Sequence, residues 1–205
     1  YNYRFAAIAT AIDELVILDV SRDQSDRAAF CAAVAQVTGN CFMPLVLGGG
    51  IRSLADAETL VSNGADKLLL NTALATDPEL VRELVAIYGS QCIIASVDYR
   101  IENGSFTVYT HQGQQRLDQP LQSYIEQLAS LQVGELYLNS IDRDGTGQGY
   151  CLASLAQLGG ATHLPVILAG GAGNQHHLLE GLQCAGVDAA ATANLFNFIG
   201  DGLPN

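Results

Sequence analysis

Short apolar runs recur along the chain, and each is followed by a glycine or polar turn and then by an amphipathic segment. Most of the runs are almost continuously hydrophobic rather than alternating, which is typical of strands covered on both faces of a sheet. The predicted strands are Leu15–Val20, Pro44–Leu47, Lys67–Asn71, Cys92–Asp98, Glu135–Ile141, Pro165–Ala169 and Asp188–Ala193. The predicted helices include Leu54–Asn63, Asp77–Tyr88, Pro120–Leu131 and Gln175–Ala185, of which Asp77–Tyr88 opens with a capping residue before proline.

One segment interrupts the alternation of strand and helix. Tyr99–Glu102 and Ser105–Tyr109 flank the dipeptide Asn103-Gly104. An Asn-Gly pair between two strand-like runs is a strong signal for a two-residue hairpin turn. We therefore expect an antiparallel hairpin directly after the strand that ends at Asp98.

The chain also contains an internal repeat. A stretch of ten residues, a glycine turn with its strand, and a Gly-x-Asp triplet each occur twice, about 121 positions apart. The repeated pairs are Glu14–Asp23 with Glu135–Asp144, Pro44–Gly50 with Pro165–Gly171, and Gly64–Asp66 with Gly186–Asp188. A repeat of this length indicates a duplicated half-domain rather than a solenoid unit.

Alternating strands and helices leave two main α/β architectures, an open doubly wound sheet and a closed barrel. Two copies of a four-strand half close naturally into a barrel with approximate twofold symmetry, whereas an open sheet gives no reason for the duplication. We expect one (β/α)8 TIM barrel domain over residues 1–205, with halves of about 1–110 and 111–205. Seven strands are countable, so the first strand and the last helix are expected to lie outside this sequence.

Composition narrows the class of protein. The net charge of −12 argues against a nucleic-acid partner. The apolar runs have the length of strands, so no membrane span is expected. The five cysteines and four histidines show no metal-ligand spacing. We expect a cytoplasmic protein without a metal or a cofactor, whose cysteines are reduced and buried.

Glycine turns follow apolar strands at equivalent places in the two halves. Gly48–Gly50 and Gly170-Gly171 allow backbone N–H groups to approach an anion closely. The strand after each turn ends in a short polar segment, Asn71-Thr72 in one half and Ala193-Asn194 in the other. Because barrel enzymes bind substrate at the carboxyl ends of their strands, this pattern predicts two phosphate sites and a substrate with a phosphate at each end.

Four carboxylates fall at or just past predicted strand ends, namely Asp19, Asp98, Asp142 and Asp144. Asp98 ends an apolar strand and is the best candidate for acid–base chemistry, although it could instead cap the hairpin that follows. Asp19 is interpreted either as a substrate-orienting group or as a structural residue. Asp144 is expected to order its loop or to bind a hydroxyl. None of the four histidines is expected to be catalytic.

Several segments together resemble the cyclase subunit of imidazole glycerol phosphate synthase. They are LGGGIRSLADAETLVSNGADKLLLNTA, YGSQCIIASVD, LNSIDRDGTGQGY and LAGGAGN, and the likeness extends over essentially the whole chain. The resemblance implies a lyase of histidine biosynthesis that takes ammonia from a glutaminase subunit. It would act on a bis-phosphorylated ribulosyl-formimino aminoimidazole carboxamide ribonucleotide, giving imidazole glycerol phosphate and aminoimidazole carboxamide ribonucleotide.

The resemblance also implies roles for individual residues. Asp98 corresponds to one of two catalytic aspartates, and the other would lie upstream of Tyr1. Glu14, Lys67, the only lysine, and Glu135 match a charged ring that admits ammonia at the bottom of the barrel. The implied phosphate-binding residues are Gly50, Asn71 and Thr72 in one half and Asp144, Gly145, Gly171, Ala193 and Asn194 in the other.

Some residues depart from the family pattern. Asn139 and Asn194 stand where the family commonly has threonine and serine. Cys41–Pro44, Leu138–Ser140 and Leu195–Gly200 resemble a paralogous branch found in surface-polysaccharide gene sets. That branch is thought to deliver ammonia to a sugar amidotransferase. A third hypothesis is a phosphate-binding ammonia conduit without catalytic activity.

Overall fold

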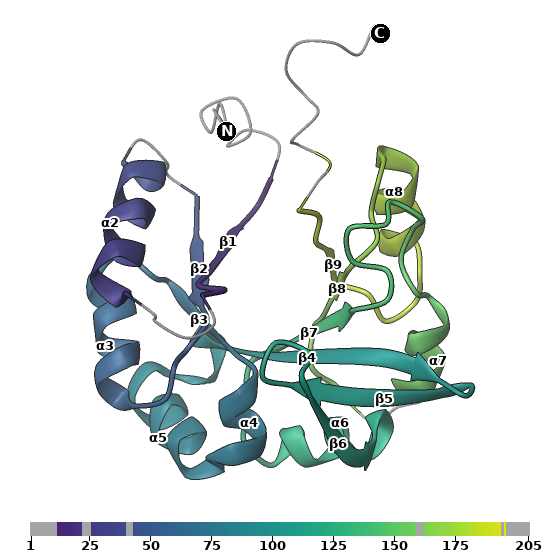
Figure 1. The fold of residues 1–205 in the computed structure, drawn as a ribbon, viewed down its shortest axis with the longest axis horizontal. Helices are drawn as coiled ribbons and strands as arrows, with labels where there is room; N and C mark the ends of the chain where they lie inside the picture. Colours follow the sequence, from purple (N-terminus) through teal and green to yellow (C-terminus); the bar gives the residue numbers. More distant parts are fainter. Residues whose placement is uncertain (1–11, 22–25, 40–42, 159–161, 194, 196–205) are drawn as a thin grey trace, which may run out of the picture. The chain divides into compact units, whose positions relative to one another are not determined.

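The structure is a computed structural model that describes residues 12–21, 26–39, 43–158, 162–193 and 195. The chain forms two compact units, Tyr1–Ile94 and Ala95–Asn205. In both units strands alternate with helices along the chain (Figure 1). This alternation, with neighbouring parallel strands, is that of a (β/α)8-barrel-like fold, as the sequence predicts.

The first unit contains three parallel strands in sequence order. They are β1 (Leu15–Leu18), β2 (Leu45–Gly48) and β3 (Lys67–Leu70). The helices of this unit are α2 (Arg27–Thr38), α3 (Leu54–Ser62), α4 (Thr72–Thr76) and α5 (Pro78–Tyr88), and a 3-10 turn follows at Ser90–Cys92. Every residue of the central strand β2 is buried, which explains its unbroken apolar sequence.

The second unit begins within β4 (Ile93–Glu102). The strand order from there is β4, β7 (Glu135–Ser140), β8 (Val166–Ala169) and β9 (Ala189–Ala190). The pairings of β7 with β8 and of β8 with β9 are parallel. Its helices are α6 (Leu121–Ala129), α7 (Ala153–Leu158) and α8 (Gln175–Leu182). All seven predicted strands are confirmed, although β9 is much shorter than the predicted run.

The predicted hairpin is confirmed and is longer than the sequence indicated. β4 pairs antiparallel with β5 (Ser105–Thr110), and the turn residues Asn103 and Gly104 have φ of 51° and 80°. Positive φ at both positions is what a type I′ turn requires. A further strand, β6 (Gln115–Pro120), pairs with β5 and was not predicted, because its sequence is polar.

The internal repeat is visible in the hydrogen bonds as well as in the sequence. Leu15 N donates to the Pro44 carbonyl at 3.0 Å, and Leu136 N donates to the Pro165 carbonyl at 2.9 Å. The repeated aspartates behave alike. Asp66 Oδ2 accepts from Leu45 N at 2.8 Å, and Asp188 Oδ2 accepts from Val166 N at 2.9 Å. Each aspartate therefore fixes the start of the neighbouring strand in its own unit.

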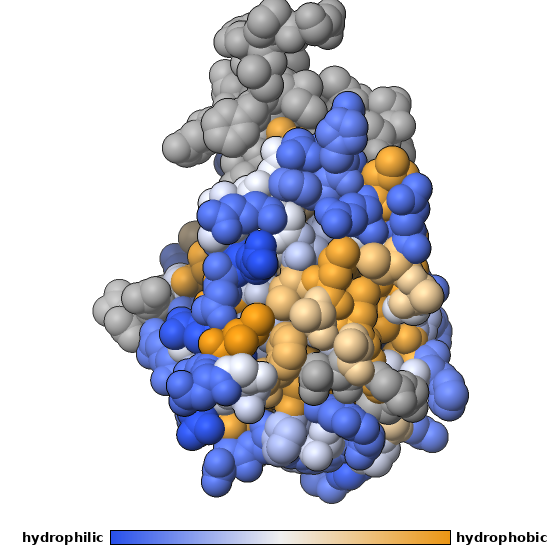
Figure 2. All heavy atoms as spheres, turned by 90° about the vertical axis from the view of Figure 1, so that its right-hand side faces the viewer, coloured by the Kyte–Doolittle hydropathy of each residue, from blue (hydrophilic) through white to orange (hydrophobic). Residues whose placement is uncertain are grey.

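Apolar residues gather on the face of the molecule that Figure 2 shows. Among the exposed large apolar side chains of the second unit are Leu179 and Leu182, one helical turn apart on α8, which are 53% and 50% exposed. Ile101 near the hairpin turn is 44% exposed. In the part of the chain that the structure describes, no helix has both the length and the apolarity needed to cross a membrane.

Candidate functional site

Asp98 lies past the buried run of β4, where the residues Ile93 to Val97 are all buried and Asp98 itself is half-buried. Its Oδ1 accepts a hydrogen bond of 2.9 Å from Asn139 Nδ2 on the neighbouring strand β7. Burial raises the pKa of the Asp98 carboxyl, the Asn139 hydrogen bond opposes that rise, and the negative charge of Asp144 adds to it. A carboxyl with a raised pKa can both hold and release a proton during a reaction.

The face of β7 that carries Asn139 also carries Tyr137. Glu135, Tyr137 and Asn139 are half-buried, whereas the alternate residues of the strand are fully buried. Burial, with smaller contributions from the charges of Asp144 and Asp98, raises the pKa of Tyr137 to about 12. The Tyr137 hydroxyl is therefore a proton-bearing donor at neutral pH on the same face as the group that holds Asp98.

The loop that follows β7 is fixed to the hairpin by Asp142. Asp142 Oδ2 accepts a hydrogen bond of 2.8 Å from Ile101 N on β4. Asp144 is exposed, and its backbone N donates to the Ser140 carbonyl at 2.9 Å. Of these two aspartates, Asp142 is committed to the backbone, whereas the Asp144 side chain lies at the surface of the loop, where a ligand can reach it.

The glycine turn after β8 packs directly on that loop. Gly149 N donates to the Gly171 carbonyl at 2.8 Å, and a Cβ on Gly171 would lie only 2.2 Å from the Gly149 carbonyl oxygen. Gly171 also has φ of 109°, which L side chains rarely adopt. Gly145 has φ of 74° and open space around the position of a Cβ. Close backbone packing thus explains why position 171 is a glycine, whereas the space around Gly145 is open to a ligand.

The remaining residues expected at the second phosphate site lie past β9. Ala193 is exposed, and Tyr150 of the preceding loop donates from its hydroxyl to the Ala191 carbonyl at 2.8 Å. This bond connects the loop after β7 with the end of β9. Asn194 lies outside the described residues.

His177 on α8 holds the far end of the same turn. Its Nδ1 accepts a hydrogen bond of 3.1 Å from Gly173 N, and the Asn174 side chain caps the helix by accepting from His176 N and His177 N. Sequence reasoning gave the histidines no role. The signal that could have found His177 is its place in the first turn of the helix that follows the glycines.

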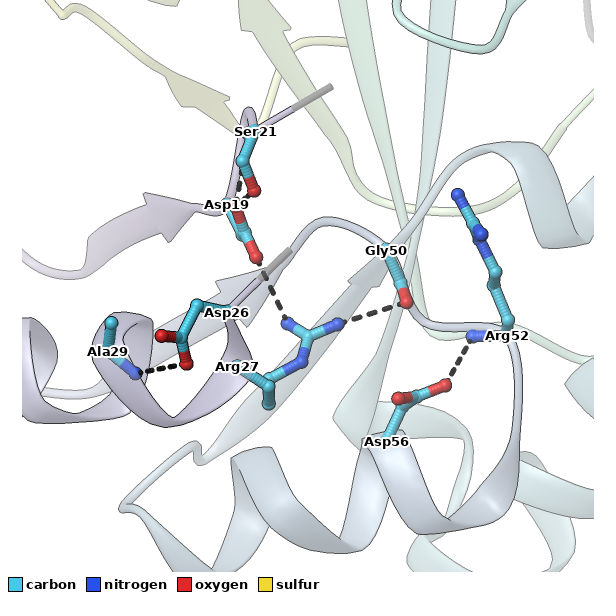
Figure 3. A network of polar contacts seen from close by, with 8 residues as sticks. All are labelled: Asp19, Ser21, Asp26, Arg27, Ala29, Gly50, Arg52 and Asp56. Atoms are coloured by element: carbon cyan, nitrogen blue, oxygen red, sulfur yellow. Dashed lines mark hydrogen bonds and ion pairs between the residues drawn. The ribbon is translucent and has the colours of Figure 1, made fainter. Parts of the chain in front are cut away.

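In the first unit the equivalent turn follows β2. A Cβ on Gly49 would lie 2.2 Å from the Asp19 carbonyl oxygen, so the end of β1 and the turn touch through their backbones. The Gly50 carbonyl accepts a hydrogen bond of 3.0 Å from Arg27 Nη2 (Figure 3). Arg27 Nη1 lies 3.8 Å from Asp19 Oδ2. The structure therefore brings Asp19 and Gly50 together through Arg27, which the sequence analysis did not single out.

Asn71 and Thr72 lie at the same edge of the sheet as this turn. The register of β2 and β3 pairs Gly48 with Leu69, so Gly50 and Asn71 each lie two residues beyond a paired position. Asn71 precedes α4, and Thr72 is the first residue of that helix. The three residues expected to bind one phosphate are thus grouped in one unit.

The charged residues expected to gate ammonia lie at the opposite ends of the strands. Lys67, the first residue of β3, forms an ion pair with Glu14, which directly precedes β1. Their side chains are 20% and 30% exposed. Glu135, the first residue of β7, occupies the position in the second unit that the repeat makes equivalent to Glu14. The expected pairing of Lys67 with a carboxylate is present. Among the residues that the structure describes, no three His, Cys, Asp or Glu side chains are grouped to bind a metal ion.

The chain is similar in sequence to known proteins of one family. A family model described as "Histidine biosynthesis protein" matches residues 5–200. A protein of Parasynechococcus marenigrum, provisionally named imidazole glycerol phosphate synthase subunit hisF2, is 43% identical over 98% of this chain and 75% of its own length. Proteins named imidazole glycerol phosphate synthase subunit HisF are also similar. Those of Chlorobium luteolum and Exiguobacterium are each 40% identical, over 91% and 90% of this chain and 74% and 72% of their own lengths. This chain belongs to the family of histidine biosynthesis proteins that includes the HisF subunits.

Proposed function

We propose that this chain is the cyclase subunit of an imidazole glycerol phosphate synthase. It combines ammonia with the bis-phosphorylated ribulosyl-formimino aminoimidazole carboxamide ribonucleotide. The products are imidazole glycerol phosphate and aminoimidazole carboxamide ribonucleotide. The observation that carries the proposal is the Asp98 carboxyl, which lies past the buried run of β4, is hydrogen-bonded by Asn139 and has a raised pKa.

Asp98 acts in this proposal as the general acid–base residue. Ring closure and release of the second product require protons to move on and off substrate nitrogen and oxygen atoms. A carboxyl whose pKa is raised by burial is better suited to both directions of transfer than an ordinary carboxyl. Asp19, whose carboxylate lies beside Arg27, orients the substrate.

The two glycine turns bind the two phosphates. Gly50, Asn71 and Thr72 bind one of them. Gly145, Gly171, Ala193 and Asn194 bind the other, and Asp144 orders its loop or accepts from a ribose hydroxyl. Backbone N–H groups at such turns bind phosphate without lysine, which suits a chain with a net charge of −12. The twofold repeat thus supplies one site for each end of the substrate.

Ammonia reaches this chemistry from a glutaminase subunit in the proposed heterodimer. In the first unit Glu14 and Lys67 lie at the amino ends of β1 and β3, away from Asp19, and in the second unit Glu135 lies at the amino end of β7. A charged pair at that end is stabilised as long as it remains intact, and it can separate to admit a small neutral molecule. We therefore place ammonia entry at the Glu14–Lys67 pair and catalysis at the carboxyl ends of the strands.

A second candidate function is ammonia delivery to a sugar amidotransferase, as in the surface-polysaccharide branch. One observation favours it. Asn139, which stands where the family commonly has threonine, contacts the candidate catalytic carboxyl directly. A change at this position alters the proton affinity of Asp98 and so distinguishes this chain from the family pattern at the candidate catalytic carboxyl.

The decisive experiment uses the full-length protein with an ammonium salt and the ribulosyl substrate, and follows loss of the substrate by absorbance. Turnover is expected without any glutaminase, because added ammonium replaces the partner's product. A folded protein that binds inorganic phosphate but gives no turnover would contradict the cyclase. That result would favour the ammonia-delivering paralogue or a non-catalytic phosphate-binding conduit. Amidation of a sugar by an added sugar amidotransferase in a reconstituted complex, expected for the paralogue and not for the conduit, then separates these two.

A further inference from the structure

Arg27 is the first residue of α2, and its side chain reaches back from the helix to the turn after β2. The backbone start of this helix is already capped, because Asp26 accepts a hydrogen bond of 3.0 Å from Ala29 N. The guanidinium is therefore free of any capping role at the helix. It contacts the Gly50 carbonyl, the Asp19 carboxylate and the face of the Phe30 ring, the last at 5.9 Å.

The guanidinium is largely buried. The Arg27 and Asp19 side chains are 16% and 8% exposed. Within the described residues, Arg27 Nε and Nη1 are buried and have no hydrogen-bond partner, although Nη1 lies within ion-pair distance of Asp19. Burying a cation with few partners is unfavourable unless an anion compensates it. Asp19 supplies the compensating carboxylate, and among the described residues Arg27 Nε is left without a hydrogen-bond partner next to this turn.

The bond from Arg27 to Gly50 has a geometric consequence. In a trans peptide the C=O and the following N–H point in opposite directions, and the described chain has no cis peptide bond. A Gly50 carbonyl that points at Arg27 therefore directs the Ile51 N–H to the opposite side of the turn. Gly50 has φ of 64°, a conformation that a flexible glycine leaves easily without an external contact.

The second unit supports this interpretation because it fixes the equivalent carbonyl differently. The Gly171 carbonyl, which corresponds to Gly50 in the repeat, accepts from Gly149 N at 2.8 Å. In both units the last glycine of the turn is thus held by a residue that lies between the preceding strand and the strand before the turn, at the start of α2 in the first unit and in the loop after β7 in the second. Of these two described contacts, the one in the first unit is made by a charged side chain, whereas in the second unit the side chain of Arg143 packs against Gly171 but its Nη1 donates to the Gln148 carbonyl.

We propose that Arg27 is a positioning residue for phosphate binding in the first unit. It fixes the orientation of the Gly50 peptide, holds the Asp19 carboxylate beside the turn and adds a positive charge that compensates a phosphate. The proposal rests on the proposed function insofar as Gly50, Asn71 and Thr72 bind phosphate. It predicts that the two phosphate sites differ in their dependence on Arg27.

The test uses Arg27→Met and Arg27→Lys in the full-length protein. Both replacements keep an unbranched stem over Phe30, but only lysine keeps the charge. Inorganic phosphate is titrated while the amide resonances of Thr72 and Gly145 report on the first and second units by NMR. Because a charge-assisted contact is lost, Arg27→Met is expected to weaken phosphate binding at Thr72 about tenfold or more. Binding at Gly145 is expected to stay within about twofold, and Arg27→Lys to retain most of the first-unit affinity.

The matched control is Arg82→Met, which removes an exposed arginine that pairs with Glu79 on α5 and should change neither titration. Arg27→Gln replaces the methionine variant if that protein does not fold. The proposal is overturned if the Arg27→Met and Arg27→Lys variants behave alike, if both units lose affinity equally, or if neither unit of the wild-type protein binds phosphate.

Steady-state kinetics separates the role of Arg27 from the proposed cyclase function. A rise in KM with little change in kcat supports both, whereas an unchanged KM in an active enzyme overturns the role of Arg27 alone. Absent turnover with an Arg27-dependent phosphate titration overturns only the cyclase.

Discussion

Asn139 Nδ2 donates a hydrogen bond of 2.9 Å to Asp98 Oδ1 across two neighbouring strands, although the residues are 41 positions apart in the chain. This bond stabilises the charged carboxylate, whereas burial and the nearby charge of Asp144 stabilise the protonated acid. Burial is the largest of these influences, so the pKa of Asp98 is raised. The proton affinity of the candidate catalytic group is thus set by residues of β4, β7 and the loop that follows β7.

Replacing Asp98 with asparagine is expected to abolish ammonia-dependent turnover, because the amide cannot exchange a proton with the substrate. Loss of a general acid–base group typically lowers kcat by about 10² to 10⁴. Binding of inorganic phosphate should stay within twofold, since Asp98 is not part of either phosphate site. Asp118→Asn, an exposed replacement on β6, is the control and should have wild-type kinetics. Turnover by Asp98→Asn at the wild-type rate would remove Asp98 from the mechanism.

The Asp98→Asn variant is also expected to be more stable against unfolding than the wild type at neutral pH. A raised pKa means that the folded state binds a proton more tightly than the unfolded chain does. Stability from this group is therefore fully present below the ordinary pKa of 3.8 and is lost as the pH rises through the folded value. Asparagine carries no charge and avoids that loss. Urea unfolding at pH 7 and pH 4.5 should show a stabilisation that shrinks at the lower pH, and a constant difference would contradict the prediction.

Removing the Asn139 amide should shift the pH profile of the reaction. In Asn139→Leu the carboxylate of Asp98 loses its hydrogen-bond donor, so the pKa of Asp98 rises further. If Asp98 must be ionised to act as a base, the acid limb of kcat/KM moves to higher pH. The profile is measured between pH 5 and pH 9 with ammonium chloride corrected for free ammonia. Asn63→Leu, at the exposed end of α3, is the control, and an unmoved limb in Asn139→Leu would show that the bond has no catalytic effect.

The two glycines expected at the second phosphate site should differ strongly in their tolerance of alanine. At Gly171 a Cβ would meet the Gly149 carbonyl oxygen at 2.2 Å, whereas at Gly145 it would meet nothing within 4 Å. Both have positive φ, which costs about 1 kcal/mol for alanine. Gly171→Ala adds a backbone clash and is expected to lower the free energy of unfolding by about 2–4 kcal/mol in total. Chemical denaturation compares the pair, and equal losses would contradict the close packing of the two loops.

Breaking the Glu14–Lys67 pair is expected to affect glutamine-driven turnover more than turnover with added ammonium. Lys67→Met removes the ion pair at the amino ends of β1 and β3, far along the strands from Asp19. We expect at least about a threefold change in the ratio of the two activities, since a partly buried ion pair contributes on the order of 1 kcal/mol. Arg82→Met removes an exposed ion pair and serves as the control. A ratio that stays at the wild-type value would exclude a gating role for Lys67.

Much of the fold follows from local patterns. The runs around Leu45–Gly48 and Ile93–Val97 are apolar because these strands are buried, and Asn103-Gly104 forms the turn that its sequence favours. The polar strand Gln115–Pro120 was not predicted, because its side chains are mostly exposed and show no apolar pattern. It forms because its backbone pairs with β5. Local sequence carries no signal for such an edge strand.

The sequence by itself determined the duplicated strand–helix plan, the two glycine turns and the candidacy of Asp98. These are periodic or repeated features, and burial and backbone geometry impose them on neighbouring residues. Only the tertiary structure decided which side chains meet. Arg27 contacts Gly50, 23 positions away in the chain, and Asn139 contacts Asp98, 41 positions away. No local sequence pattern between the partners indicates either contact. The physical reason is that hydrogen bonds and pKa values depend on distance and burial in space, and only the folded chain fixes these quantities.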